Sequence, residues 1–120
     1  MRITHTQIGD SPATLYQSDT QSDLLVVVSH GFAGSRQMME SLSLSLAKAG
    51  LDVVAFDYLG HGRHTQALSP DITTLEGTTE DLVQQTLDVV SAAKARTGHQ
   101  RLALVGHSMA TDVIIRAAER

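Results

Sequence analysis

The chain has 120 residues, of which 42% are hydrophobic and 18% charged, a balance that suits one globular domain and excludes a largely disordered chain. Nine Lys and Arg against thirteen Asp and Glu give a net charge of −4, which offers no basic surface for nucleic acid or an anionic membrane. Cysteine is absent, which excludes disulfides and thiolate ligands, and Met1 to Asp10 lacks the pattern of a signal peptide, so we expect a cytoplasmic protein.

Met1 to Gln17 predicts an antiparallel hairpin. Its β-branched and polar residues flank a group that is typical of turns, namely Gly9, Asp10, Ser11 and Pro12. The next segment, Leu24 to Val28, is a continuous apolar run. Such a run indicates a strand that is buried on both faces, as in a parallel sheet.

A helix is expected after this strand, with Ser35 as its N-cap and Gly50 as its end. Apolar residues recur there at steps of three and four, which predicts one buried stripe formed by Met39, Leu42, Leu46 and Ala49. Leu51 to Phe56 is a second apolar run and predicts a second buried strand, which closes on Asp57.

A polar loop is predicted from Tyr58 to about Gly77, followed by a helix that Thr78 or Thr79 would cap. Gly98 would end this helix, and its buried face is predicted to contain Val83, Leu87 and Val90.

Arg101 to Val105 predicts a third buried strand, and Met109 to Arg120 a last helix. The apolar residues of this helix include Val113, Ile114, Ala117 and Ala118. A hairpin followed by strands that alternate with helices predicts the α/β class, with parallel strands joined by right-handed crossovers.

The segment Gly106-His107-Ser108-Met109-Ala110 lies between a predicted strand and a predicted helix. This is the context of a Gly-x-Ser-x-Gly nucleophile elbow, here with alanine as the last residue. Small residues let the strand and the helix approach closely while the serine occupies a strained turn. The N–H groups at the helix start can stabilise an oxyanion. Alternatively, Ser108 only caps the helix.

The residues His30-Gly31-Phe32 follow the first buried strand. Parallel strands end at the same edge of a sheet, so these residues can lie close to Ser108 and contribute to the same site. A glycine at position 31 lets the backbone turn outward. The N–H of Phe32 can then join that of Met109 in an oxyanion hole, while His30 supports the loop. The alternative is a simple glycine turn beside an incidental histidine.

Three stretches together resemble the α/β-hydrolase family of serine hydrolases: VVVSHGFAGS (26–35), VVAFDYLGHGRH (53–64) and LVGHSMA (104–110). The second is similar to the D-x-x-G-H-G-x-S loop of this family, with His64 in place of serine. The nearest branch contains esterases, lysophospholipases and serine aminopeptidases. The resemblance implies a partial α/β-hydrolase sheet and a small acyl substrate, an ester rather than an amide, without a cofactor or metal.

The resemblance also assigns roles to individual residues. Ser108 would be the nucleophile, and the backbone N–H groups of Phe32 and Met109 would form the oxyanion hole. Four neighbours would support them: His30, Gly31, Gly106 and His107.

The family triad also needs an acid and a histidine after the nucleophile. Residues 109–120 contain Asp112 and Glu119 but no histidine. His61 and His64 lie in the loop after the second buried strand, but nothing in the sequence directs either side chain to Ser108. We therefore expect residues 1–120 to be the N-terminal half of one hydrolase domain, inactive in isolation.

Two other classes of protein stay open. The strand that ends at Gly106 would be an unpaired apolar edge, so the chain could be a complete, non-catalytic binding module that pairs this edge with a partner. A flavodoxin-like domain would need a phosphate-binding loop, and His30 to Ser35 matches neither a P-loop nor G-x-G-x-x-G. His61 and His64 lack nearby carboxylates and do not indicate a metal site.

Overall fold

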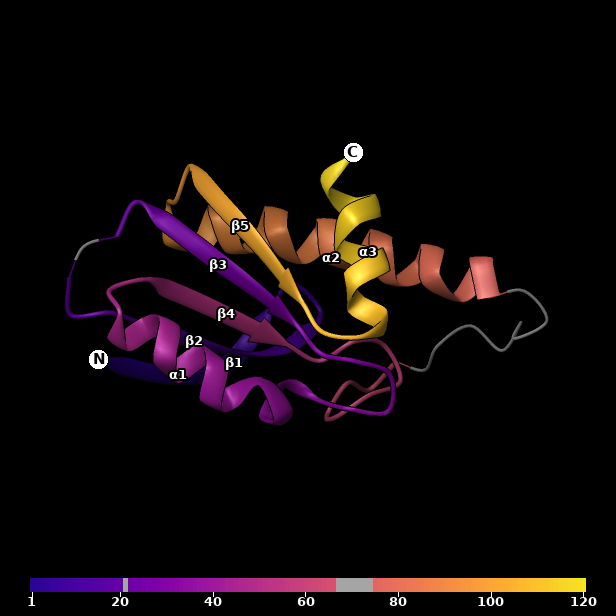
Figure 1. Cartoon of the computed structure of the whole chain (residues 1–120), viewed down its shortest axis with the longest axis horizontal. Helices are drawn as coiled ribbons and strands as arrows, with labels where there is room; N and C mark the ends of the chain where they lie inside the picture. Colours follow the sequence, from indigo (N-terminus) through magenta and orange to yellow (C-terminus); the bar gives the residue numbers. More distant parts are fainter. Residues whose placement is uncertain (21, 67–74) are drawn as a thin grey trace.

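The computed structural model describes residues 1–20, 22–66 and 75–120, except for the side chains of 75–79. These residues form a five-stranded mixed sheet in the order β1-β2-β4-β3-β5 (Figure 1). The strands are β1 (Arg2–Ile8), β2 (Ser11–Gln17), β3 (Leu24–Ser29), β4 (Asp52–Phe56) and β5 (Arg101–Gly106). β3, β4 and β5 run parallel, and β2 joins β4 antiparallel, so the predicted α/β class is confirmed.

The predicted hairpin is confirmed, with a tighter turn than the sequence indicated. Ile8 pairs with Ser11, so the turn itself contains only Gly9 and Asp10. Gly9 has a φ of 59°, which glycine adopts without steric cost. Ser11 and Pro12 belong to β2, in contrast to the prediction.

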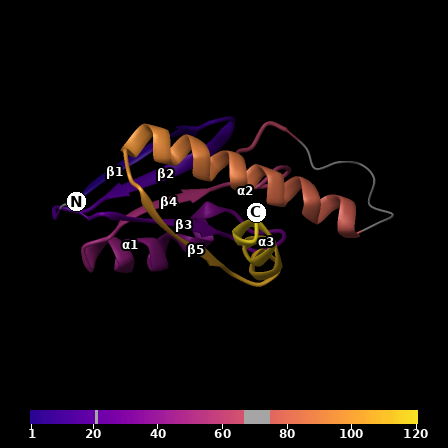
Figure 2. The same ribbon diagram turned by 90° about the horizontal axis from the view of Figure 1, so that it is seen from above.

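Helices cover both faces of the sheet. Helix α1 (Glu40–Lys48) lies on the opposite side from α2 (Leu75–Thr97), as Figure 2 shows. Helix α3 (Met109–Ala118) packs with α2. Because successive side chains of a strand point to opposite faces, Leu25 and Val27 meet α2 and α3, whereas Val26 and Val28 meet α1.

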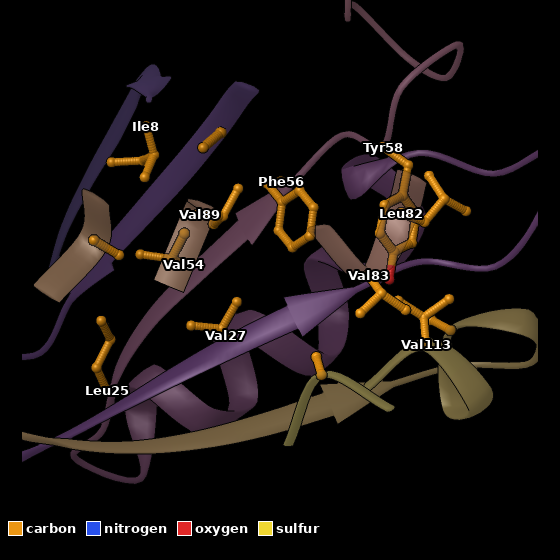
Figure 3. Close-up of a cluster of buried hydrophobic side chains, with 14 of the residues drawn as sticks. Ile8, Leu25, Val27, Val54, Phe56, Tyr58, Leu82, Val83, Val89 and Val113 are labelled. Carbon is orange, nitrogen blue, oxygen red and sulfur yellow. The ribbon is translucent and has the colours of Figure 1, made fainter. Parts of the chain in front are cut away.

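The larger apolar cluster lies between the sheet and helices α2 and α3 (Figure 3). Val27 and Val54 are neighbours on the parallel strands, and both are fully buried there beside Val83 and Val113. Burying each side chain of this size contributes about 1.5–3 kcal/mol. This cluster holds β3, β4 and both helices in fixed relative positions.

The predicted start of the first helix is wrong, and its predicted buried face is confirmed only in part, since Met39 is buried and Leu46 packs against the core. A 3₁₀ helix, η1 (Arg36–Met39), precedes α1, and the Ser35 hydroxyl makes no capping hydrogen bond. Leu42 is 39% exposed and Ala49 is also exposed, whereas the buried residues are Met39, Ser43 and Ala47. The buried stripe of α1 is centred on Ser43 and Ala47, one position after the predicted Leu42 and Leu46. One residue corresponds to a rotation of about 100° in an α-helix, which turns Leu42 toward solvent.

Helix α2 begins at Leu75, so the predicted N-cap at Thr78 or Thr79 is wrong. Residues 67–74 of the predicted loop lie outside the described residues. The predicted face is confirmed: Val83 is buried, and the partly buried Leu87 and Val90 pack against the core. Threonine followed by acidic residues resembles a helix start, but such local preferences are weak beside tertiary packing. In the part of the chain that the structure describes, no helix is long and apolar enough to cross a membrane.

Strand β5 is only half-buried, in contrast to the predicted third buried strand. Among the described strands it pairs with β3 alone and forms the edge of the sheet. Its face toward α2 and α3 borders a hollow of about 500 Å³, whose apolar lining includes Leu102, Leu104, Ile114 and Ile115. A strand is covered fully only when it has neighbours on both sides, and β5 has one.

Candidate functional site

The polar residues singled out from the sequence gather at one edge of the sheet, where β3, β4 and β5 end. In the parallel register, Ser29 lies beside Phe56 on one side and Gly106 on the other. The His107 N–H donates to the Ser29 carbonyl at 3.2 Å, which holds the segment after β5 against the end of β3. The segments that begin at His30, Asp57 and His107 therefore leave the sheet together.

Ser108 lies in the sharp turn between β5 and α3. Its backbone has φ 58° and ψ −119°, an uncommon conformation for a residue with a side chain, and the residue is exposed. Its hydroxyl makes no capping hydrogen bond, so the alternative that Ser108 only caps α3 is wrong. The N–H of Thr111 donates to the Ser108 carbonyl at 3.0 Å and continues the turn into the helix.

The small residues of the turn have a steric reason. A Cβ atom at Gly106 would lie 2.7 Å from the carbonyl oxygen of Ala110 and 3.2 Å from its Cβ. Ala110 itself is fully buried. Glycine at 106 thus allows β5 and α3 to cross in contact, and alanine fits at the last position of the elbow.

The segment Gly31–Ser35, which we call the glycine loop, lies directly against Ser108. A Cβ atom at Gly31 would be 3.2 Å from the Ser108 Cβ and 3.4 Å from the His107 Nδ1. The Gly34 N–H donates to the Gly31 carbonyl at 3.1 Å, and Ala33 has a φ of 63°. The glycine loop and the elbow, though 77 positions apart between Gly31 and Ser108, form one surface.

Two backbone N–H groups close to the turn lack a partner in the part of the chain that the structure describes. Among the described residues, neither the N–H of Phe32 nor that of Met109 donates a hydrogen bond. Phe32 follows the glycine that contacts Ser108, and Met109 is the first residue of α3, where the helix dipole is positive. Within the described residues, both N–H groups remain unused as hydrogen-bond donors.

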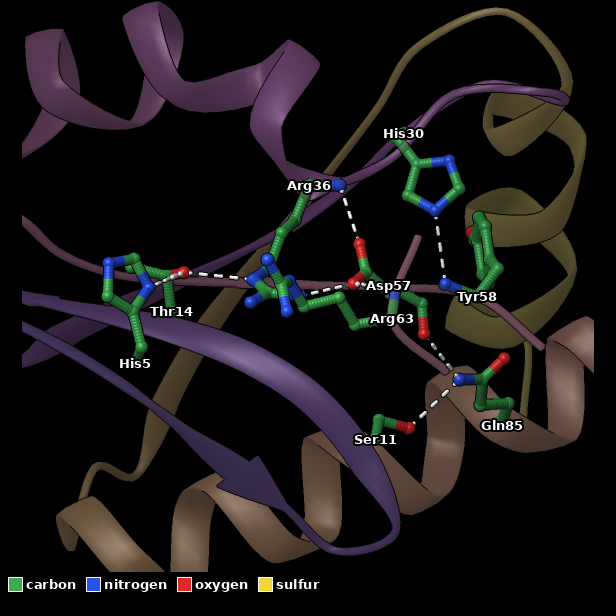
Figure 4. Close-up of polar contacts among 9 residues, drawn as sticks. All are labelled: His5, Ser11, Thr14, His30, Arg36, Asp57, Tyr58, Arg63 and Gln85. Carbon is green, nitrogen blue, oxygen red and sulfur yellow. Dashed lines mark hydrogen bonds and ion pairs between the residues drawn. The ribbon is translucent and has the colours of Figure 1, made fainter. Parts of the chain in front are cut away.

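His30 is buried and joins the ends of β3 and β4. Its Nε2 accepts the Tyr58 N–H at 3.0 Å (Figure 4), so Nδ1 carries the proton and donates to the Gly31 carbonyl at 2.7 Å. Burial lowers the pKa of His30, which keeps the ring neutral. His30 therefore joins the glycine loop to the segment after β4, and its supporting role at an active site stays a prediction.

The histidines of the following loop are bound elsewhere. His61 Nδ1 lies 2.9 Å from the Leu59 carbonyl, and the His61 ring is 5.3 Å from that of Phe32. His64 Nδ1 accepts the Gln66 N–H at 3.1 Å. In residues 1–20, 22–66 and 80–120, no hydrogen bond joins the Ser108 hydroxyl to an imidazole or a carboxylate. Asp112 is mostly exposed and lies 3.7 Å from Arg116.

Sequence reasoning missed the polar network around Asp57 (Figure 4). This carboxylate is 1% exposed, accepts the backbone N–H groups of Arg36 and Arg63 at 2.8 and 3.0 Å, and pairs with the Arg36 guanidinium. Gln85 of α2 donates to the Asp57 carbonyl at 3.0 Å and accepts the Leu59 N–H at 2.9 Å. The aspartate at the strand end was visible in the sequence, but no signal indicated Arg36 or Gln85 as its partners.

Comparisons with known proteins identify the family and the fold. The family model described as "Serine aminopeptidase, S33" matches residues 20–120. A comparison with curated proteins gives no match.

Many solved structures share the fold. The esterase Est1E from Butyrivibrio proteoclasticus, bound to ferulic acid, is 21% identical, with a TM-score of 0.76 over 96% of this chain and 46% of its own. The Pyrococcus furiosus esterase PF2001 is 23% identical, with a TM-score of 0.75 over 96% and 43%. An epoxide hydrolase from an endophytic Streptomyces is 24% identical, with a TM-score of 0.70 over 98% and 32%.

The chain thus spans less than half the length of each of these three structures. At such identities, the structures establish the fold alone. The family model covers most of the chain, from residue 20 to residue 120. The chain therefore belongs to the serine aminopeptidase S33 family of α/β-hydrolases.

Proposed function

We propose that residues 1–120 are the N-terminal half of a serine hydrolase domain that cleaves carboxylic esters, or less readily amides. The observation that supports this proposal is the close approach of Gly31 to Ser108, which is exposed and has a strained backbone. The residues that follow each of them, Phe32 and Met109, have backbone N–H groups that make no hydrogen bond among the described residues. Strain of this kind is found at sites where a side chain must be held in one position.

In the proposed reaction, the Ser108 hydroxyl oxygen attacks the acyl carbon while a base removes its proton. The N–H groups of Phe32 and Met109 stabilise the resulting oxyanion. The tetrahedral intermediate then expels the alcohol, which takes up that proton, and leaves an acyl-Ser108 ester. Water hydrolyses this ester and regenerates the serine.

The described residues place no base or acid at Ser108, and we propose that both come from a part of the parent protein beyond residue 120. A serine without a base is a weak nucleophile, so we expect the isolated chain to turn over little substrate. The exposed Phe32 and Met38 favour a substrate with an apolar part near the glycine loop. A cytoplasmic location is also part of this proposal, and cell fractionation would test it.

The experiment is covalent labelling with a fluorophosphonate, which reacts with activated serines. We expect the longest natural protein that contains this chain to be labelled on the peptide that carries Ser108. The matched Ser108→Ala variant should not be labelled. A folded parent protein that stays unlabelled would contradict the proposal, as would serine-dependent esterase activity of residues 1–120 alone.

A second candidate function is supported by the half-buried edge strand β5 and the apolar hollow beside it. In this case, the chain would be a binding module that adds a strand from a partner or a second copy. Sedimentation of residues 1–120 distinguishes the two candidates. Concentration-dependent dimers of residues 1–120, together with a parent protein that stays unlabelled by the fluorophosphonate, favour the binding module. A folded monomer of residues 1–120 argues against it.

A further inference from the structure

We propose that Asp57 is a positioning residue that fixes the glycine loop, and with it the N–H of Phe32, through the backbone of Arg36. This inference rests on the proposed function, because it concerns the oxyanion hole of the same reaction. Asp57 itself does not contact the reacting atoms.

The Asp57 carboxylate joins three segments of the chain at the end of β4. One oxygen accepts the Arg36 N–H at 2.8 Å, immediately after the glycine loop. The other accepts the Arg63 N–H at 3.0 Å and pairs with the Arg36 guanidinium. The Arg36 Nε also donates to the Thr14 hydroxyl of β2 at 3.0 Å (Figure 4). The start of η1 is thereby tied to two strands of the sheet.

A carboxylate suits this place better than any other side chain of its size. Both oxygens receive donors, and hydrogen bonds to a charged acceptor are stronger than neutral ones. Asparagine offers one acceptor oxygen, and its NH₂ group would face an N–H donor. The backbone has adapted to the carboxylate as well: Gly62 has a φ of 55°, and a Cβ atom there would overlap the Asp57 side chain.

The glycine loop is fixed at its two ends. Gly31 is held against the elbow, where a Cβ would be 3.2 Å from that of Ser108. Arg36 is held by Asp57. Phe32 lies between these ends and is 65% exposed. Its ring is 5.3 Å from that of His61, in the loop that Asp57 holds through the Arg63 N–H. If the Arg36 end is released, the Phe32 N–H loses its position relative to Ser108.

Asp52, at the opposite end of β4, provides a matched control. Its carboxylate also accepts a backbone N–H from another segment, that of Ser18 at 2.8 Å, and it lies 2.9 Å from the His99 Nε2. Its side chain is 15% exposed. Asp52→Asn therefore removes a carboxylate that holds a backbone N–H at the other end of β4, far from the glycine loop.

The test compares the wild-type parent protein with its Asp57→Asn and Asp52→Asn variants. We would measure fluorophosphonate labelling rates, kcat and KM for p-nitrophenyl butyrate, and urea unfolding. For Asp57→Asn we expect kcat and the labelling rate to fall about 10- to 100-fold, since small misplacements of catalytic groups have effects of this size, with KM changed less than about twofold. Asp52→Asn should lower stability while kcat stays near the wild-type value.

A folded Asp57→Asn variant with wild-type kcat and labelling rate would overturn the inference and leave the proposed function intact. An unlabelled, folded wild-type protein would overturn both. If Asp57→Asn does not fold, Gly62→Ala decides, because it displaces the carboxylate without removing it. A reduced kcat in Gly62→Ala supports the role of Asp57, and an unchanged kcat overturns it.

Discussion

At the carboxyl ends of β3 and β5, the backbone turns through non-glycine residues with positive φ, Ala33 at 63° and Ser108 at 58°. The turns before β4 and β5, at the opposite end of the sheet, use glycine instead: Gly50 at 101° and Gly98 at 78°. Glycine adopts these angles without steric cost, whereas other residues need support from their surroundings. The comparison shows that strain and close packing concentrate at the end where the reaction is proposed.

The largest effect is expected for Gly106→Ala, because the added methyl would meet the Ala110 backbone at 2.7 Å. Overpacking of this kind should lower the free energy of unfolding by about 2–3 kcal/mol, measured by urea denaturation. Gly98→Ala is the control from the opposite end of the sheet. It has open space but a positive φ, and should cost about 1 kcal/mol. Equal losses in the two variants would contradict the proposed difference in packing.

A pH effect is also expected from the carboxyl end. Because burial lowers the pKa of His30, the folded protein favours the neutral ring, while the unfolded chain takes up a proton near the ordinary value of 6.5. The contribution of His30 is therefore complete above pH 6.5 and is lost as the pH falls below it, by at most about 1.4 kcal/mol per pH unit.

Urea unfolding at several pH values from neutral downward measures this loss. The His30→Gln variant has no imidazole at this position, so the dependence of its stability on pH below 6.5 should be weaker than in the wild-type protein. Identical slopes for the two proteins would show that His30 does not contribute.

A smaller effect, of opposite sign, is expected for Ser108→Gly. Glycine relieves the strained backbone at φ 58°, so the variant should gain about 1 kcal/mol of stability while fluorophosphonate labelling is lost. Ser108→Ala is the matched control, since it removes the hydroxyl but keeps the strain. If both variants gained equally, the backbone at this position would not be strained.

The smallest effect is expected at the amino end of β5. Arg101 and Asp23 form an ion pair 2.8 Å long, but their side chains are 69% and 75% exposed. Water and salt screen such pairs, so Arg101→Gln should leave the melting temperature unchanged within error. A clear decrease would mean that this end of the sheet depends on specific contacts as well.

The features that could be predicted from the sequence are local. Apolar runs such as Leu24 to Val28 predicted the strands, and the glycine-serine pattern at 106–110 predicted the turn, because each signal lies within a few residues. The partners of Asp57 could not be predicted in this way. Arg36 lies 21 positions before it and Gln85 lies 28 positions after it, so only the folded sheet brings them together. Leu42 was misplaced because the small residues Ser43 and Ala47 are the buried ones in α1, and the spacing of the leucines does not indicate this.

The parallel pairing around β3 also has a consequence for the order of folding. Val27 pairs with Val54 across 27 positions of the chain, but with Leu104 across 77. Closing the longer loop costs more chain entropy, so we expect β5 to dock after β3 and β4 have paired. The strained turn at Ser108 would then form late, on a sheet that is already in place. Changes there should accelerate unfolding more than they slow folding.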